Sequence, residues 1–420
     1  MTAPAISTAA PGAGRAATAP VVTGLGVVAP NGIGVADYWD ATLHGRVGIR
    51  RIEGFDPSSY PATLAGEVRL DPAGKIPGRL IPQTDHMTHL ALLAAEEALG
   101  DAGADPAAMP DYATGVVTAA SAGGFEFGQR ELEALWSRGS RYVSAYQSFA
   151  WFYPVNTGQI SIRYGMRGPS SALVAEQAGG LDAVAKGRRH VRGGTALMLA
   201  GGVDGSLCPW AWLCLIRSRG LSLATDPARA FLPFDRAANG FVPGEGGALL
   251  VLEDAADARA RGVNDHYGAV AGYAATFDPP PGSGRPSGLR RAVELALADA
   301  RMVPGDIGVV FADAAGNAAG DRDEAETLAA VFGPRSVPVT APKTMTGRLL
   351  GGGAPLDLAA ALLSMRDAVI PPTVNVADPA FGDLLDLVRD EPRECRVESA
   401  LVVARGTGGY NSAMVLRRTV

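Results

Sequence analysis

Cysteine and histidine are both scarce in this sequence of 420 residues, which contains three cysteines and five histidines. The cysteines form no CxxC pair and have no spacing typical of a metal site or a disulfide framework. We therefore expect no metal and no disulfide, and a protein of the reducing cytoplasm. No cofactor-binding motif is evident, because no GxGxxG pattern follows a strand and opens a helix.

Excess charge and long apolar runs are also missing. Lys and Arg number 37 against 43 Asp and Glu, a net charge of −6, which gives no general attraction for nucleic acid or an anionic membrane. No apolar run approaches the ~20 residues that span a bilayer. The first residues are mostly small and have no signal-peptide pattern. We interpret residues 1–20 as a disordered leader.

What is present is an alternation of strands and helices. A β-branched run at residues 21–32 closes in a Pro-Asn-Gly turn, and a helical pattern at 89–103 precedes a strand at 114–124. The same order returns at residues 288–317. This repetition predicts two related halves, residues 21–260 and 261–420.

Further strands are predicted at residues 195–205, 246–254 and 400–418, each rich in small and apolar residues. Near-continuous apolar strands that alternate with helices indicate sheets covered on both faces. The predicted fold is α/β, with five layers in the order α/β/α/β/α.

The most informative stretch is residues 165–189, "GMRGPSSALVAEQAGGLDAVAKGRR". It reads as a turn, a short strand and a sharp start of an Ala-rich helix, the layout of a nucleophile elbow. A side chain at such a helix start is exposed to the helix dipole and to free backbone N–H groups. Gln177 occupies this place, and an amide cannot serve as a covalent nucleophile.

At this point the chain resembles the β-ketoacyl synthase family of the thiolase superfold, and specifically the chain length factors, or ketosynthase beta subunits, of type II aromatic polyketide synthases. The resemblance covers nearly the whole chain. It is carried by "VVTGLGVVAPNG", "SFAWFYPVNTGQISI", "VAEQAGGLDA", "LPFDRAANGFVPGEGGALLVLED" and "GTGGYNSAMVL".

The resemblance implies that the catalytic residues have been lost. Active members carry a cysteine at the elbow and two later histidines, whereas this chain has no histidine beyond residue 266. The family's histidine positions fall on Ala315 and Arg348, while Lys343 and Glu326 are retained. With Gln177 at the elbow as well, we expect no catalytic residue in this chain.

The helical segment that starts near residue 125 has two interpretations. Phe125, Gly128 and Leu132 follow helical spacing, which is typical of a stripe that faces the core. The resemblance implies instead that they line a substrate chamber at a heterodimer interface, where side-chain bulk limits the polyketide. Glycine at position 128 then argues for a long product.

Two further surfaces are predicted. Aromatic residues crowd into residues 142–153, and the resemblance favours Phe149, Trp151 and Phe152 as the interface with a ketosynthase alpha subunit. The basic run at 186–194 is either a solvated helix end or a docking site for an acyl carrier protein. The residues concerned in the second case are Arg188, Arg189 and Arg192.

The favoured function is a non-catalytic partner that sets polyketide chain length. Two alternatives stay open, a malonyl-carrier-protein decarboxylase that uses Gln177 and a scaffolding protein unrelated to acyl chains. Relatives that decarboxylate with such a glutamine keep both histidines, which this chain lacks. One further departure is Thr407, which stands where many active ketosynthases have a phenylalanine gate.

Overall fold

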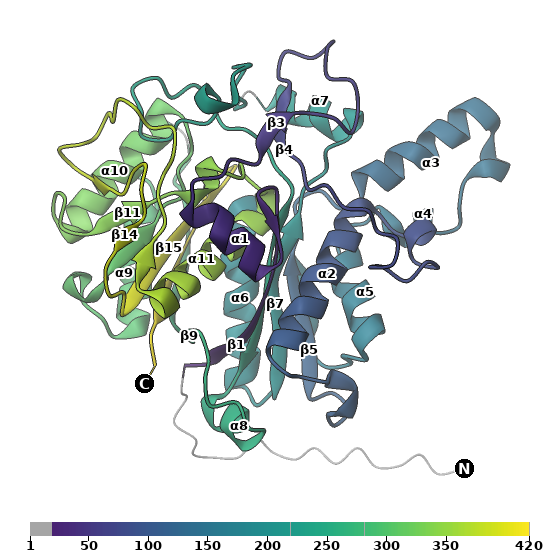
Figure 1. Ribbon diagram of the computed structural model, residues 1–420, viewed down its shortest axis with the longest axis horizontal. Coiled ribbons are helices and arrows are strands. Elements are labelled where there is room, and N and C mark those ends of the chain that lie inside the picture. Colours follow the sequence, from purple (N-terminus) through teal and green to yellow (C-terminus); the bar gives the residue numbers. More distant parts are fainter. Residues whose placement is uncertain (1–18, 219, 281, 420) are drawn as a thin grey trace.

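The computed structural model describes residues 19–218, 220–280 and 282–419. All but the last two residues of the predicted disordered leader lie outside the described residues. Within the described part of the chain, twelve strands form one mixed sheet (Figure 1). Its path is β13 (Asp386–Leu387), β11 (Pro338–Thr340), β10 (Val309–Phe311), β15 (Ser399–Gly406), β16 (Tyr410–Arg417), β9 (Gly268–Phe277), β1 (Val21–Ala29), β8 (Gly246–Glu253), β7 (Leu197–Asp204), β5 (Thr114–Ala119) and β6 (Ser170–Leu173), with β2 (Gly32–Ile33) paired to β1.

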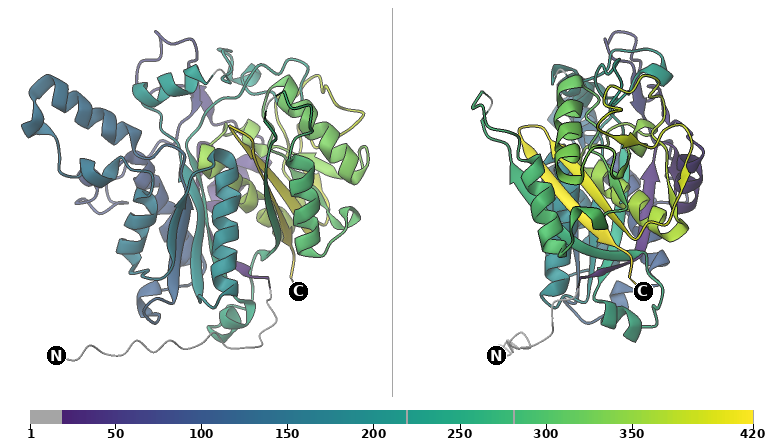
Figure 2. Two further views of the ribbon diagram at one scale, coloured as in Figure 1. Left: turned by 180° about the vertical axis from the view of Figure 1, so that it is seen from behind. Right: turned by 90° about the vertical axis from the view of Figure 1, so that its left-hand side faces the viewer.

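The sheet is covered on both faces and also folds around a central layer of helices. The central helices are α6 (Glu176–Arg192) and α11 (Gly353–Asp367). Helix α6 contacts β7 and β15, and α11 contacts β8 and β15. The outer layers are α2 (His86–Asp101) and α5 (Val155–Tyr164) on one side, and α9 (Leu289–Ala300) and α10 (Ala318–Phe332) on the other (Figure 2). The predicted α/β fold of five layers is confirmed.

Strand β7 shows how the sequence builds these layers. Met198 and Ala200 belong to the central core together with α6 and α11, while Leu197 and Leu199 belong to the core beneath α2. Side chains alternate between the faces of a strand, so a strand buried on both faces must be apolar throughout. This requirement explains the near-continuous apolar strands of the sequence.

The remaining elements lie at the ends of the layers. Helix α3 projects away from the body of the molecule, with α4 beside its base (Figure 1). Two small sheets pair β3 (Ile49–Arg51) with β4 (Leu64–Gly66) and β12 (Val369–Ile370) with β14 (Arg393–Glu394). The other helices are α1 (Val35–Leu43), α3 (Phe125–Arg138), α4 (Gln147–Ala150), α7 (Pro209–Arg217) and α8 (Ala255–Ala260).

The structure refines the predicted elements at their ends. The first predicted helix, residues 89–103, is α2 and starts three residues earlier, at His86. The predicted strand 400–418 is the hairpin β15–β16, because Gly408 and Gly409 adopt φ values of 94° and 105° and reverse the chain. The division into halves at residue 260 stays a prediction. In the described residues, no helix has the length and apolar character needed to cross a membrane.

Candidate functional site

The predicted elbow joins β6 to α6. Strand β6 ends at Leu173 and α6 begins at Glu176, whose φ of 49° is unusual for a residue other than glycine. The next residue, Gln177, is 1% exposed and lies in the first turn of the central helix. The sharp turn therefore directs the Gln177 side chain into the protein interior.

Arg348 fills the space in front of Gln177. The Gln177 amide is oriented so that both its oxygen and its nitrogen have hydrogen-bond partners. In this orientation the oxygen accepts hydrogen bonds from Arg348 Nη2 at 2.7 Å and Nε at 2.8 Å. The same amide donates to the carbonyl oxygen of Leu350 at 3.3 Å. A Cβ atom on Gly353 would lie 2.1 Å from the Gln177 amide, so only glycine at position 353 leaves room for this side chain.

The charge of Arg348 is balanced by Asp313, which follows β10. Arg348 Nη1 lies 3.1 Å from Asp313 Oδ2 and also donates to the carbonyl oxygen of Asp313 at 2.9 Å. Burial opposes ionisation of Asp313, but the cations of Arg348 and Lys343 outweigh it and hold its pKa below the usual range. The centre of the site is therefore a buried ion pair capped by an amide.

Ala315 and Arg348 line the same cavity, which has a volume of about 680 Å³. Glu176 and Thr407 also line it, and the Glu176 carboxylate accepts a hydrogen bond from the Thr407 backbone N–H. The structure thus brings together the positions that the resemblance identified: the elbow, Ala315, Arg348 and the Thr407 loop.

Lys343 has a structural role beside the cavity. Its Nζ lies 2.7 Å from Asp357 Oδ2 and donates to the carbonyl oxygens of Ala312 at 2.7 Å and Asp313 at 3.1 Å. Lys343 is 5% exposed. The ammonium group therefore has two hydrogen-bond acceptors and one ion-pair partner, and the lysine holds the end of β10 against α11.

Glu326 lies outside the site. Glu326 is exposed and pairs on the surface with Arg322. The buried carboxylate is Glu324, which accepts hydrogen bonds from the backbone N–H groups of Asp313 at 2.7 Å and Ala314 at 2.9 Å. Burial and the neighbouring charge of Asp313 raise the pKa of Glu324 to about 7. The two residues lie on different faces of α10, and only one face points toward the site.

The described residues that line this cavity include no thiol and no imidazole. Cys208 is buried elsewhere, and burial raises its pKa to about 11, which leaves the thiol protonated and unreactive. His86 pairs with Glu245 at 3.4 Å, and His89 contacts the Thr84 hydroxyl at 3.0 Å. Among the described residues of the site, none therefore offers a thiolate or an electrophilic imidazole.

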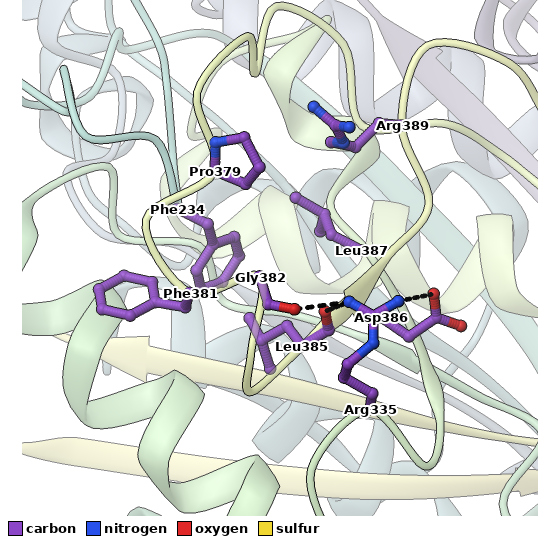
Figure 3. Close-up of a pocket in the computed structure, with 9 residues that line it drawn as sticks. All are labelled: Phe234, Arg335, Pro379, Phe381, Gly382, Leu385, Asp386, Leu387 and Arg389. Atoms are coloured by element: carbon purple, nitrogen blue, oxygen red, sulfur yellow. Dashed lines mark hydrogen bonds and ion pairs between the residues drawn. The ribbon is translucent and has the colours of Figure 1, made fainter.

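A smaller cavity of about 140 Å³ lies in the C-terminal part of the chain (Figure 3). Arg335 points into it and donates to the carbonyl oxygens of Gly382 and Leu385 at 2.5 Å and 3.2 Å. The guanidinium also lies 3.9 Å from Asp386. Its cation is already partnered, and no predicted site residue lines this cavity.

The predicted chamber residues face two tryptophans on one side of α3. The rings of Phe125 and Trp210 lie 4.5 Å apart between centroids. A Cβ atom on Gly128 would meet both Trp151 and Trp210 at 3.4 Å. Leu132 is 37% exposed and lines a groove of about 700 Å³ together with Trp210. The three residues therefore form a stripe beside a surface groove, while Phe127 supplies the core contact.

Sequence-family comparison matches two consecutive parts of the chain. The β-ketoacyl synthase N-terminal domain matches residues 19–258, and the β-ketoacyl synthase C-terminal domain matches residues 267–377. The chain belongs to the β-ketoacyl synthase family.

Among its relatives in this family are both subunit types of one synthase from Streptomyces glaucescens. The chain is 62% identical to the tetracenomycin polyketide synthase ketoacyl synthase beta subunit, over 95% of this chain and 98% of the relative. It is 36% identical to the corresponding alpha subunit, over 95% and 96% of the two chains. The chain therefore resembles the beta subunit much more closely.

The fold of this β-ketoacyl synthase family member agrees with solved structures. It superposes on a chain of the ishigamide ketosynthase/chain length factor with a TM-score of 0.86 and 26% identity, over 96% of this chain and 99% of that chain. The predicted thiolase-like fold is therefore confirmed.

The aromatic residues predicted at the partner interface lie at the base of the projecting α3. Trp151 is 44% exposed and Phe152 is 41% exposed, while Phe149 is half-buried. Tyr142, Tyr146 and Tyr153 are exposed beside them in the sequence. Exposed aromatic surface of this extent is unusual on a protein that functions as a monomer.

Arg188 does not belong to a docking surface, contrary to expectation. It is 6% exposed, pairs with Asp299 at 2.7 Å and donates to the carbonyl oxygens of Val270 and Ala271. Helix α6 is central, so its basic last turn is covered on the side of Arg188. Arg189 and Arg192 are exposed, at the opposite end of α6 from Gln177.

Sequence reasoning missed the carboxylates that organise this site. Asp313 pairs with Arg348, Glu324 binds the loop after β10, and Asp357 pairs with Lys343. Asp313 and Asp357 are each an acidic residue within an otherwise apolar or small-residue stretch, whereas Glu324 lies in a charged run. This signal is available in the sequence, because buried carboxylates almost always have a charged or hydrogen-bonding partner.

Proposed function

We propose that this chain is the non-catalytic beta subunit, or chain length factor, of a type II polyketide synthase. The observation that carries the proposal is the buried contact between Gln177 and Arg348, which occupies the place of an acyl-carrying nucleophile. The 62% identity to a ketoacyl synthase beta subunit supports it. The chain would form a heterodimer with a ketosynthase alpha subunit that supplies the catalytic residues.

In this division of labour the alpha subunit holds the growing chain on its cysteine and drives decarboxylative condensation. The beta subunit receives the lengthening poly-β-ketone and limits it by volume. We propose that Phe125, Gly128 and Leu132 form that limit, because they lie on one face of α3 against two tryptophans. Glycine at position 128 leaves the most room and favours a long product.

Two features support a partner on the same side of the molecule. Trp151 and Phe152 expose large apolar surface, which is typical of obligate interfaces. Strand β6 is an edge of the described sheet, and Val174, directly after it, is 48% exposed. An edge strand beside apolar residues is a favourable place for a strand of a partner subunit to add.

An acyl carrier protein is the second proposed partner. Arg189 and Arg192 are exposed and could contact its acidic surface, whereas Arg188 is committed to Asp299. We expect the complex to operate in the cytoplasm and to contribute to antibiotic biosynthesis.

Decarboxylation by Gln177 is not favoured. The amide oxygen already accepts from Arg348, and the amide nitrogen already donates to Leu350. One of the two amide hydrogens is therefore already engaged, the amide oxygen is bound by a cation, and Ala315 offers no imidazole to assist.

The proposal is tested by assembling the synthase from purified parts. This chain, the alpha subunit and the pair are each supplied with malonyl-carrier protein, and the products are analysed by mass. A single long polyketide is expected from the pair alone, and none when the cysteine of the alpha subunit is replaced. Carbon–carbon bond formation by this chain alone would show it to be an enzyme. The same product from the alpha subunit alone would remove its role in chain length.

A further inference from the structure

Asp85 lies where the start of α2 meets the start of α3. It precedes His86 as the N-cap of α2, and its Oδ1 accepts a hydrogen bond from the Met87 N–H at 2.9 Å. Its Oδ2 accepts from the N–H of Phe127, in the first turn of α3, at 2.8 Å. One carboxylate therefore caps two helices.

The second cap is needed because α3 has none of its own. The residue at its N-cap position is Gly124, which has no side chain to accept a hydrogen bond. A larger residue could not replace it, since a Cβ on Gly124 would lie 2.2 Å from the carbonyl oxygen of Ala150 and 2.9 Å from Asp85 Cβ. Close packing at Gly124 thus excludes a local cap, and Asp85 supplies one from another element.

The stripe that faces the groove starts in this same turn. Phe125 and Gly128 flank Phe127 in α3; the Phe125 ring contacts Trp210 of α7, and a Cβ on Gly128 would meet the same ring. The backbone N–H of Trp210 is in turn held by Gln129 Oε1 of α3 at 2.9 Å. Any rotation or fraying at the start of α3 would therefore change the distance between Gly128 and Trp210.

We propose that Asp85 is a positioning residue that fixes the start of α3 and thereby the width of the polyketide chamber. The inference rests on the proposed function, because it assigns Asp85 to the chamber-lining helix of a chain length factor. Asp85 itself does not touch the polyketide. Its effect is transmitted through the backbone of α3 to Phe125 and Gly128.

Asparagine at position 85 tests the double cap. Asn has one acceptor oxygen, so one of the two backbone N–H groups would face an amide nitrogen. In the assembled synthase, Asp85→Asn is expected to raise the share of products of other lengths about fivefold, the effect of losing one helix cap. Asp235→Asn is the matched control, since Asp235 is also buried and bridges two backbone N–H groups, those of Ala237 and Asp378, in another part of the chain.

A pH series on the unaltered complex gives a second readout. Burial raises the pKa of Asp85 to about 6, although its two backbone hydrogen bonds favour the carboxylate. The charged and titratable groups that face it are His86, Glu126 and Cys208, with Glu245 behind His86. Protonation removes acceptor capacity, so the mixture of lengths should broaden between about pH 8 and about pH 6. Asp85→Asn should abolish this dependence.

The outcomes separate the inference from the proposed function. If Gly128→Trp shortens the product but Asp85→Asn co-purifies with the alpha subunit and leaves the mixture unchanged, the positioning role is wrong and the chamber stands. The role is also wrong if Asp235→Asn broadens the mixture equally. If Asp85→Asn does not assemble with the alpha subunit, the pH series decides. A mixture of product lengths that does not change with pH in the unaltered complex would then overturn the positioning role of Asp85. If Gly128→Trp also has no effect, the chamber itself is misplaced.

Discussion

Arg348 binds the Gln177 amide oxygen with two guanidinium nitrogens, at 2.7 Å and 2.8 Å, in the interior of the protein. The resemblance implies that active relatives carry a histidine and the acyl-carrying cysteine at these two positions. The arginine points at the helix start where an oxyanion would be stabilised, and it places a permanent cation and an amide there. Under the proposed function, a former active site has become part of the structural core.

Removal of Arg348 should destabilise the protein strongly. In Arg348→Ala the buried carboxylate of Asp313 loses its ion pair, and an uncompensated buried charge costs about 3–5 kcal/mol. Denaturant unfolding of the purified chain measures the loss. Arg236→Ala is the control, because Arg236 and Asp378 form an exposed pair worth less than about 1 kcal/mol. Equal losses in both variants would contradict a structural role for Arg348.

Cysteine at the elbow should react as a thiol without restoring catalysis. In Gln177→Cys the new thiol would lie at a helix N-terminus beside Arg348, which favours a pKa below about 7.5. We expect rapid alkylation at neutral pH, whereas buried Cys208 stays unreactive because its pKa is about 11. No condensation of malonyl-carrier protein is expected from this variant alone, since Ala315 and Arg348 provide no imidazole. Condensation at a rate near that of the alpha subunit would refute this account.

The chamber assignment predicts opposite results for two substitutions at one position. A Cβ on Gly128 would sit in ordinary contact with Trp151 and Trp210 at 3.4 Å, so Gly128→Ala should keep the product length. The indole of Gly128→Trp cannot fit in the space between Trp151 Cβ and the Trp210 ring, and we expect it to project toward the groove that Trp210 lines. The product should then be shorter, as measured by mass in the assembled synthase.

The control for this comparison is Gly100→Trp, at a helix position with nothing within 4 Å of an added Cβ. This variant adds the same side chain where it meets only solvent, and the product should be unchanged. An unchanged product from Gly128→Trp would remove Gly128 from the chamber.

The layers and the elbow could be predicted because each depends on local pattern. Strands such as β7 are apolar on both faces, and the turn before α6 is formed by residues that are adjacent in the sequence. The Arg348–Asp313 pair could not be predicted, because its partners lie on different elements and meet only in the folded chain. Sequence shows which residues carry charge, but not which charges share a cavity.

The placements of Glu326 and Arg188 have the same physical origin, the rotational setting of a helix. Glu324 and Glu326 differ by two positions on α10, which places them on different faces. Arg188 is buried while Arg189, one position later, is exposed. A signal for α6 was present, since a Cβ at Gly180 or Gly187 would lie within 2.8 Å of a neighbouring side chain. Glycines on one face of a helix indicate that it is closely covered there.

The pair of half-buried His86 and buried Glu245 predicts that stability falls in mild alkali. Burial lowers the pKa of His86, but the hydrogen bond and charge of Glu245 outweigh it and raise the pKa to about 9. Because the folded value lies above the ordinary value of 6.5, this stabilisation is complete below about pH 6.5 and is lost as pH rises toward 9. The difference corresponds to about 2–3 kcal/mol in the free energy of unfolding.

The free energy of unfolding, measured at about pH 6.5 and at about pH 9, gives this contribution by linkage. His86→Gln should lose stability at the lower pH and little at the higher, so the two proteins converge in alkali. His44→Gln should follow the unaltered chain at both values, because His44 and Asp40 form an exposed pair. Parallel stability curves for His86→Gln and the unaltered chain would mean that the His86–Glu245 contact carries no net charge interaction. His86 directly follows Asp85 in the chain. If the stabilities of the two proteins converge in alkali, an ionised, pH-sensitive pair therefore lies beside the residue that caps α3.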